Sequence, residues 1–166
     1  MNMNPVIHLR AATNEDCSQI YKWRNRDEII ALSTTLKPVS WPEHVKWFNR
    51  SLKSKQCYIY IIIHHYVSIG KVRFDSVCDS ISEISIYIIS EYTGKGLGVT
   101  SIVQATAKIF KLIPELQTVV AFIRNENINS IRAFSKAGYV LDNSSLRREN
   151  HTVFSIERLS INANFL

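Results

Sequence analysis

The chain has 166 residues, the length of a single ordinary domain, and 46% of them are hydrophobic while 20% are charged. This composition supports a folded core and excludes a disordered chain, which would be poor in apolar residues and strongly charged. The longest apolar run, Cys57 to Ile63, has seven residues, whereas a membrane span needs roughly 18 or more. We therefore expect one domain over residues 1–166, without a signal peptide, located in the cytoplasm and not bound to a membrane.

The cysteines and the net charge narrow the function classes further. Three cysteines without a CxxC pair predict no disulfide framework, and the histidines and cysteines lack the spacing of a metal site. The net charge of +6 favours an anionic ligand. The densest basic pair, Arg147-Arg148, is not interleaved with aromatic residues as a stacking platform for nucleic acid would be. We expect no metal and no nucleic acid, and a phosphorylated small molecule fits the charge equally well.

The first third of the chain predicts one strand and two helices. Residues 6–11 form a short apolar run that is typical of an edge strand. The segment Thr13–Asp16 resembles a capping box and begins a first helix, with an Asp in the place of the usual Glu or Gln. Ser40-Trp-Pro-Glu43 begins a second helix, because Pro42 falls in the first turn, where its missing N–H costs nothing.

The rest of the chain predicts six strands and two helices. His64-His65-Tyr66 reads as a hairpin turn, although it lacks the glycine of a tight one. The order β-α-α-β-β-β-α-β-α-β-β predicts an α/β domain with a mostly antiparallel sheet and one parallel crossover, followed by a loose tail over 160–166. The strands are expected at 57–64, 68–75, 81–89, 118–123, 139–141 and 152–158, and the helices at 98–112 and 127–137.

Three of the five glycines, Gly94, Gly96 and Gly98, lie within five residues between a strand and a long helix. A turn of this kind directs free backbone N–H groups outward, and the helix N-terminus adds positive potential, so the segment is a candidate phosphate site. A merely tight connection is the alternative. The segment is not a P-loop, since Gly-Lys-Ser/Thr is missing, and it follows the fourth strand, which is wrong for a dinucleotide fingerprint.

Two longer segments resemble a known family. Residues 83–98 resemble the acetyl-CoA signature of the GNAT N-acetyltransferases, and residues 127–139 resemble their second motif, Asn-x-x-Ser/Ala-x-x-x-aromatic-x-x-x-Gly-aromatic. The order of elements agrees, and the resemblance covers roughly residues 6 to 158. It implies a GNAT fold, in which a mixed, mostly antiparallel sheet of about six or seven strands has a splayed central pair and about four flanking helices. It also implies acetyl-CoA as the co-substrate.

The resemblance implies where CoA binds. In the family the pyrophosphate lies on an Arg/Gln-x-x-Gly-x-Gly/Ala loop, which corresponds to Thr93–Gly98, and Thr93 brings a hydroxyl in place of a charge. Main-chain groups near residues 86–88 would pair with the pantetheine and polarise the thioester carbonyl. The expected CoA-binding residues are Ile86, Ile88, Thr93, Gly94, Lys95, Gly96, Leu97, Gly98, Val99, Asn127 and Ser130.

Direct transfer to an amine requires a base, because an alkylammonium is mostly protonated near neutral pH. Glu83 matches the family position where a glutamate often serves, and the alternative is a solvated charge at a strand end. The tyrosine that commonly protonates the leaving thiolate is Phe134 here. The candidates for that step are therefore a water molecule or the hydroxyl of Ser130 or Tyr87.

The N-terminal third carries the indication of the acceptor. Three segments, at residues 23–25, 41–48 and 70–75, are similar to a branch of the family. The enzymes of this branch acetylate amino groups on nucleotide-linked sugars, in pseudaminic acid and surface-polysaccharide pathways. Aromatic side chains could stack on a base or sugar, and Arg24 and Arg73 could clamp a diphosphate; the alternative is that the aromatic residues and His44 belong to the core. The expected acceptor-binding residues are Trp23, Arg24, Asn25, His44, Trp47, Arg73 and Asp75.

Three functions remain open from the sequence. The first is an N-acetyltransferase that acts on a small-molecule amine, a nucleotide-linked amino sugar, without a covalent enzyme intermediate. In the second the acceptor is a protein N-terminus or a ribosomal protein. The third is a non-catalytic module that binds acyl-CoA. A homodimer is a further expectation.

Overall fold

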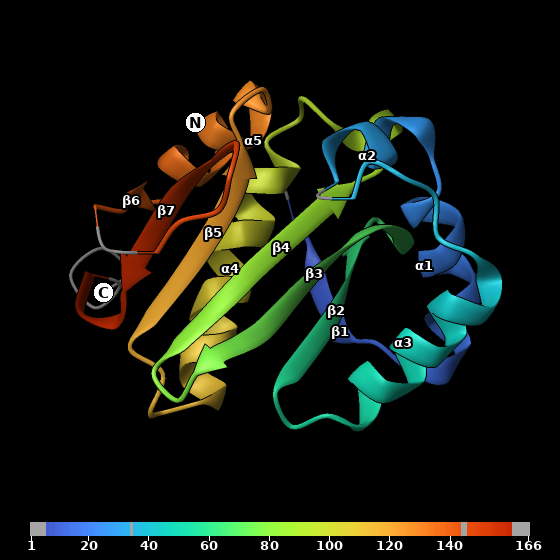
Figure 1. The fold of residues 1–166 in the computed structure, drawn as a ribbon, viewed down its shortest axis with the longest axis horizontal. Coiled ribbons are helices and arrows are strands. Elements are labelled where there is room, and N and C mark those ends of the chain that lie inside the picture. Colours follow the sequence, from blue (N-terminus) through green and yellow to red (C-terminus); the bar gives the residue numbers. More distant parts are fainter. Residues whose placement is uncertain (1–5, 34, 144–145, 161–166) are drawn as a thin grey trace.

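The computed structural model describes residues 6–33, 35–143 and 146–160, which form a seven-stranded sheet with helices on both faces (Figure 1). The strand order is β1-β2-β3-β4-β5-β7-β6, and all pairs are antiparallel except β4 with β5. The strands are β1 (His8–Ala11), β2 (Cys57–His64), β3 (Val67–Cys78), β4 (Ile81–Ile88), β5 (Thr118–Arg124), β6 (Val140–Leu141) and β7 (His151–Glu157). The helices are α1 (Cys17–Arg24), α2 (Asp27–Leu32), α3 (Trp41–Lys53), α4 (Leu97–Leu112) and α5 (Ile128–Lys136), with short 3₁₀ turns at Asn14–Asp16 and Ser90–Tyr92.

The predicted order of strands and the mixed sheet are confirmed. The helix α2 was not predicted, because its six residues carry too little periodicity to separate them from the end of α1. The predicted capping box is present at Thr13 with Asp16, and the predicted start of the second helix carries another, at Ser40 with Glu43. The predicted loose tail lies outside the described residues, apart from residue 160.

The sheet separates two hydrophobic cores. On one face α4 and α5 cover a large core that includes Phe74, Ile102 and Phe134. On the other face α1 and α3 cover a smaller core that includes Trp23, Phe48 and Ile61. Because side chains alternate along a strand, the even-numbered residues of β4 face α4 and the odd-numbered residues face the side of α1 and α3. We call this second side the acceptor face.

The hairpin between β2 and β3 turns at His65 and Tyr66, as predicted. Both residues have positive φ angles, 46° and 66°, which is the conformation of a type I′ turn. Such turns favour Asn and Gly, so two bulky residues make this hairpin strained. The side chain of Tyr66 is fully exposed and gains no packing in return.

The central strands β4 and β5 separate after only three residue pairs. Ile81–Glu83 pair with Thr118–Val120, and beyond these residues the two strands diverge towards the top of Figure 1. The splayed central pair implied by the sequence is therefore confirmed. Helix α4 begins above the wide end of the gap, where the chain leaves β4 through the 3₁₀ turn and the glycine cluster.

Candidate active site

The glycine cluster forms a loop that opens directly into α4. Gly94 and Gly96 have φ angles of 74° and 77°, a left-handed conformation that glycine adopts without strain, and Gly96 is the residue before the first helical turn. The backbone N–H groups of residues 94–99 have no hydrogen-bond acceptor in the described part of the chain. Together with the positive end of α4 they provide the donors that a phosphate requires.

The polar side chains of this loop are directed back to the protein. The Thr93 hydroxyl donates to the carbonyl of Ser90 at 2.9 Å, and the Lys95 ammonium donates to the carbonyl of Glu91 at 2.9 Å. In this conformation the hydroxyl of Thr93 is therefore not free to donate to a ligand. The anion-binding capacity of the loop lies in its main chain.

The gap between β4 and β5 presents unpaired main-chain groups. The N–H of Ile89 donates to Ile69 in β3 at 2.9 Å. Hydrogen-bonding direction alternates along a strand, so the N–H and C=O groups of Ile86 and Ile88 point the other way, towards β5. They lie beyond the last paired residue, Glu83, and can pair with an extended ligand, as predicted for the pantetheine arm.

The start of α5 borders the same gap. Asn127 is the residue before the helix, and its side-chain oxygen accepts from the N–H of Ser130 at 3.1 Å. Phe134 is buried and packs edge-on against Tyr139, with ring centroids 5.0 Å apart. Phe134 is thus part of the core under α5, and it offers no proton donor to a ligand.

On the acceptor face, cationic and aromatic side chains from three elements meet. The Lys71 amine lies 5.2 Å from the ring centroid of Trp47 and 5.4 Å from that of Tyr87, and the Arg73 guanidinium lies 5.1 Å from the Trp47 ring. Arg73 also forms an ion pair with Asp75. Burial, and next the neighbouring Arg73, lower the pKa of Lys71 from 10.5 to about 7.

Arg24, at the end of α1, adds a further cation to this face. Its Nη2 donates to the hydroxyls of Ser33 and Thr35 at 3.2 and 2.9 Å, whereas its Nη1 is buried and has no hydrogen-bond acceptor among the described residues. The Nε of Arg73 is in the same situation. Burial lowers the pKa of Arg24. Two guanidinium groups therefore keep unused N–H donors on one face of the sheet.

Two of the expected acceptor residues have structural partners instead. Asn25 exchanges two hydrogen bonds of 2.8 Å with the main chain of Val39 and so holds the segment between α2 and α3. His44 is buried, and its Nε2 pairs with the carbonyl of Cys17 at 2.9 Å. Burial lowers the pKa of His44, which keeps the ring neutral in the core between α1 and α3.

Trp23 and Tyr87 join α1 to the centre of the sheet. Trp23 is buried, and its ring meets Tyr87 edge-on at 6.2 Å. The Tyr87 hydroxyl donates to the carbonyl of Ile20 at 3.4 Å, and burial raises its pKa. Trp23 is thus a core residue, and a phenol with a raised pKa is a weak proton donor for a thiolate. Tyr87 stays a prediction for that step, with this geometry against it.

Glu83 lies where β4 and β5 part, and it has a partner that the sequence did not indicate. The Arg148 guanidinium donates to both carboxylate oxygens, at 3.0 and 2.8 Å, and stacks 4.0 Å from the ring centroid of Phe122 in β5. Glu83 stays a candidate base, and each of its oxygens keeps a further lone pair beside the hydrogen bond from Arg148.

Two residues of the acceptor face, Lys71 and Arg148, were missed by sequence reasoning. The segment Gly70–Asp75 held a signal for the first, because Lys71 and Arg73 alternate on one face of a strand. For Arg148 the only signal was the basic pair itself, and its partner is 65 residues away in the chain.

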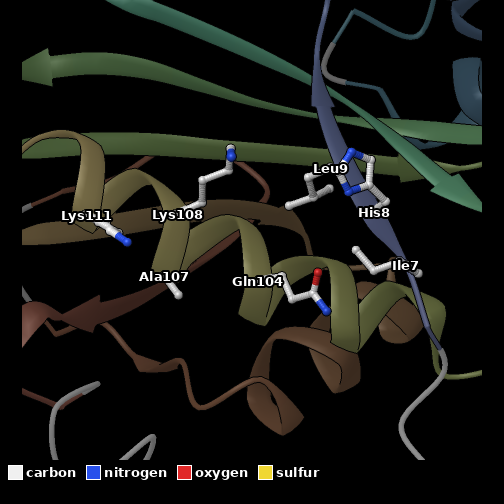
Figure 2. Close-up of a pocket in the computed structure, with 7 residues that line it drawn as sticks. All are labelled: Ile7, His8, Leu9, Gln104, Ala107, Lys108 and Lys111. Carbon is white, nitrogen blue, oxygen red and sulfur yellow. The ribbon is translucent and has the colours of Figure 1, made fainter.

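One hollow on the surface lies away from these groups. A shallow pocket of about 360 Å³ is formed between β1 and α4, and Figure 2 shows Lys108 and Lys111 on its rim. Neither the glycine loop nor the acceptor face contributes a side chain to it. We therefore base the candidate site on the loop, the gap and the acceptor face.

Within the described residues, no group of three His, Cys, Asp or Glu side chains is arranged to hold a metal ion. None of the described helices is long and apolar enough to cross a membrane.

Comparison with solved structures shows the same fold in several acetyltransferases. The chain superposes on the aminoglycoside acetyltransferase AAC(6')-Ib in complex with coenzyme A with a TM-score of 0.83, at 18% identity, covering 96% of this chain and 99% of that one. For the spermidine N-acetyltransferase from Vibrio cholerae in complex with CoA and spermine the TM-score is 0.79, at 20% identity, covering 93% and 96%. For the Campylobacter jejuni N-acetyltransferase PseH in complex with acetyl coenzyme A it is 0.69, at 13% identity, covering 92% and 99%.

The sequence itself matches a family. No curated protein matches the chain, but residues 7–140 match the acetyltransferase (GNAT) domain. This match covers the loop, the splayed strands and the acceptor face apart from Arg148, and the fold agrees with it. The expected GNAT fold and acyltransferase class are confirmed, and the chain belongs to the GNAT acetyltransferase family.

Proposed function

We propose that this GNAT acetyltransferase transfers the acetyl group of acetyl-CoA to a primary amine of an anionic small molecule, a nucleotide-linked amino sugar. One observation carries the anionic part of the proposal. Arg24 and Arg73 keep buried N–H groups without acceptors on the acceptor face. A diphosphate supplies oxygen acceptors in the geometry that guanidinium groups bind well.

The acidic residues of the acceptor face support the same conclusion. Asp75 is paired with Arg73, and Glu83 is paired with Arg148. Both carboxylates are already paired with arginines, whereas Arg24 and the net charge of +6 attract an anion. Spermidine and aminoglycosides, which the solved acetyltransferases of this fold are named for, therefore fit this face poorly.

The chain's own groups suggest how the reaction proceeds. The main chain of residues 94–99 holds the pyrophosphate of acetyl-CoA, and the main chain of Ile86 and Ile88 holds the pantetheine arm and polarises the thioester carbonyl. The amine approaches from the acceptor face and attacks directly. The three cysteines, of which Cys78 alone is exposed, are free, in keeping with the proposed cytoplasmic location. The homodimer stays a prediction.

The test is a panel of acceptors assayed by CoA release with acetyl-CoA at saturation. The panel holds a nucleotide-linked amino sugar, the same amino sugar without the nucleotide, spermidine, an aminoglycoside and a peptide with a free N-terminus. We expect the highest kcat/KM for the nucleotide-linked sugar. A preference for spermidine or the aminoglycoside would contradict the anionic acceptor, and a preference for the peptide would favour a protein acetyltransferase. Acetyl-CoA binding without turnover of any amine in the panel would favour the third function, a non-catalytic module that binds acyl-CoA.

Two variants examine the clamp itself. Arg24→Met and Arg73→Met each remove charge-assisted hydrogen bonds, which are worth about 1.5–3 kcal/mol, so KM for the nucleotide-linked sugar should rise about 10-fold or more. The matched control is Arg50→Met, because Arg50 is exposed on the last turn of α3. Equal KM values for all three variants would contradict the proposal that Arg24 and Arg73 bind the diphosphate.

A further inference from the structure

Lys71 is a buried lysine without a hydrogen-bond acceptor. It is 7% exposed, and among the described residues it forms neither an ion pair nor a hydrogen bond. Its neighbours across the sheet are Ile61 in β2 and Tyr87 in β4, and the Trp47 ring lies above its amine. A protonated lysine has three donors to satisfy, so this setting holds the neutral amine better than the ammonium ion.

The charges that face Lys71 act in both directions, and burial is the largest cause of its lowered pKa. Arg73 and Arg24 lower that pKa further, whereas Cys57 and Asp75 raise it, and Asp75 is itself paired with Arg73. Tyr87 keeps its proton, because burial raises its pKa. The titratable and charged groups that face Lys71 are Arg24 from α1, His44 from α3, Cys57 from β2, Arg73 and Asp75 from β3 and Tyr87 from β4.

Lys71 is also close to the place of reaction. A Cβ atom on Gly70 would collide with the main chain of Tyr87, so β3 and β4 approach each other closely at this point. Lys71 is paired with Tyr87 across the sheet. Tyr87 lies between Ile86 and Ile88, and the main-chain groups of these two residues face the gap. An amine that enters from the acceptor face therefore passes Lys71 on its way to the thioester.

We infer that the side-chain amine of Lys71 accepts the proton that the acceptor's ammonium group loses before the transfer. This inference rests on the proposed function. It assigns to Lys71 the role of general base, for which the sequence offered Glu83, a residue that forms an ion pair with Arg148. The lowered pKa of Lys71, about 7, matches what a base needs near neutral pH.

The step balances as follows. The ammonium group passes one proton to the Lys71 amine, and the neutral amine forms a bond to the carbonyl carbon of the thioester. The bond between that carbon and sulfur breaks, and the second proton of the amine passes to the sulfur of CoA. The Lys71 ammonium then releases its proton to solvent, so that acetyl-CoA and the protonated amine give the amide, CoA and one proton.

The experiment compares pH profiles of kcat/KM for the acceptor in Lys71→Met, Lys71→Arg and wild type. In the wild type we expect activity to rise with pH, with its midpoint near pH 7 and a plateau above about pH 8. Both variants should lose about 10²–10⁴-fold in kcat and lose this rise, while their acetyl-CoA affinity stays within a few-fold of wild type. Lys71→Arg is decisive, because arginine keeps the charge and cannot act as a base. Wild-type activity and an unchanged profile in Lys71→Arg would overturn the inference.

A matched variant and a second measurement separate this inference from its premises. Glu83→Gln should keep the rise near pH 7, and loss of that rise would assign the base to Glu83. Independently of turnover, an NMR titration of protein labelled with ¹³C at the lysine side chains gives the Lys71 signal by difference from Lys71→Met. We expect that signal to titrate near neutral pH. A Lys71 that stays protonated up to pH 9 overturns the inference whatever the acceptor panel shows.

Discussion

Replacing Lys71 by methionine should stabilise the protein while it removes catalysis. Methionine has a similar length, and it can pack between Trp47 and Tyr87 without a group that must lose a proton. In the wild type the pKa of this lysine falls from 10.5 to about 7 on folding. Each pKa unit corresponds to about 1.36 kcal/mol, so this shift lowers the free energy of unfolding by about 4 kcal/mol at pH 7. The contact of the amine with the two rings returns about 1 kcal/mol, which leaves a net gain of about 2–3 kcal/mol for Lys71→Met.

The sign and the pH dependence of the stability difference between Lys71→Met and wild type identify the cause of that difference. Below pH 7 both states of the wild type hold the proton, so the gain from Lys71→Met is largest and constant there. Between pH 7 and 10.5 only the unfolded chain binds the proton, so the free energy of unfolding of the wild type rises with pH and the gain shrinks. Above that range only the difference in packing remains.

Urea unfolding at pH 6.5, 8 and 9.5 measures this gain. Lys46→Met is the matched control, because Lys46 is exposed on the same helix as Trp47 and its replacement should change stability by less than about 0.5 kcal/mol. A gain that stays constant from pH 6.5 to 9.5, or a less stable Lys71→Met variant at pH 6.5, would refute the argument. A residue that costs stability where it stands is typical of a functional site.

Three further predictions concern the loop, the hairpin and α5. Gly96→Trp should abolish acetyl-CoA binding, because the indole would stand in a left-handed position where the pyrophosphate lies; micromolar binding in calorimetry would contradict the loop assignment. Tyr66→Gly should raise the free energy of unfolding by about 0.5–1 kcal/mol in a urea titration, since the turn needs a positive φ there and the side chain is exposed; a loss of stability would show that the turn is not strained. Asn127→Ala should cost about 1 kcal/mol through the lost helix cap and weaken acetyl-CoA binding several-fold; a loss of stability with unchanged affinity would restrict Asn127 to capping.

The features that the sequence predicted correctly depend on short stretches of chain. Period-two and helical patterns give the strands and most helices, and capping residues such as Ser40 mark where α3 begins. The loop follows from a contiguous motif, residues 83–98, whereas the splayed strands were implied by the resemblance to the GNAT family. Local geometry of this kind is encoded within about one turn or one strand, so it can be read without knowledge of the packing.

The features that were missed depend on contacts between distant segments. Lysine is rarely buried, so an alternating strand with Lys71 and Arg73 indicates a face exposed to solvent. In the structure α1 and α3 cover that face, and Lys71 is therefore buried. For His44 the sequence left both a ligand contact and a core position open, and the structure buries its ring and pairs it with the carbonyl of Cys17. The pairing of Glu83 with Arg148 joins a strand to a loop before β7, which no spacing rule predicts.

The distribution of charge on the acceptor face explains how one fold can serve amines of opposite character. A polycationic acceptor needs free carboxylates, and here it would have to displace Arg73 from Asp75 and Arg148 from Glu83 before it gained an ion pair. An anionic acceptor needs no such exchange, because the buried Nη1 of Arg24 and Nε of Arg73 have no acceptor among the described residues to give up. Its phosphates would also favour a positive charge at Lys71, so the proton that leaves the amine would be taken up most readily once the correct acceptor is bound. On these two proposals, acceptor selection and proton removal would be coupled through Arg24, Arg73 and Lys71.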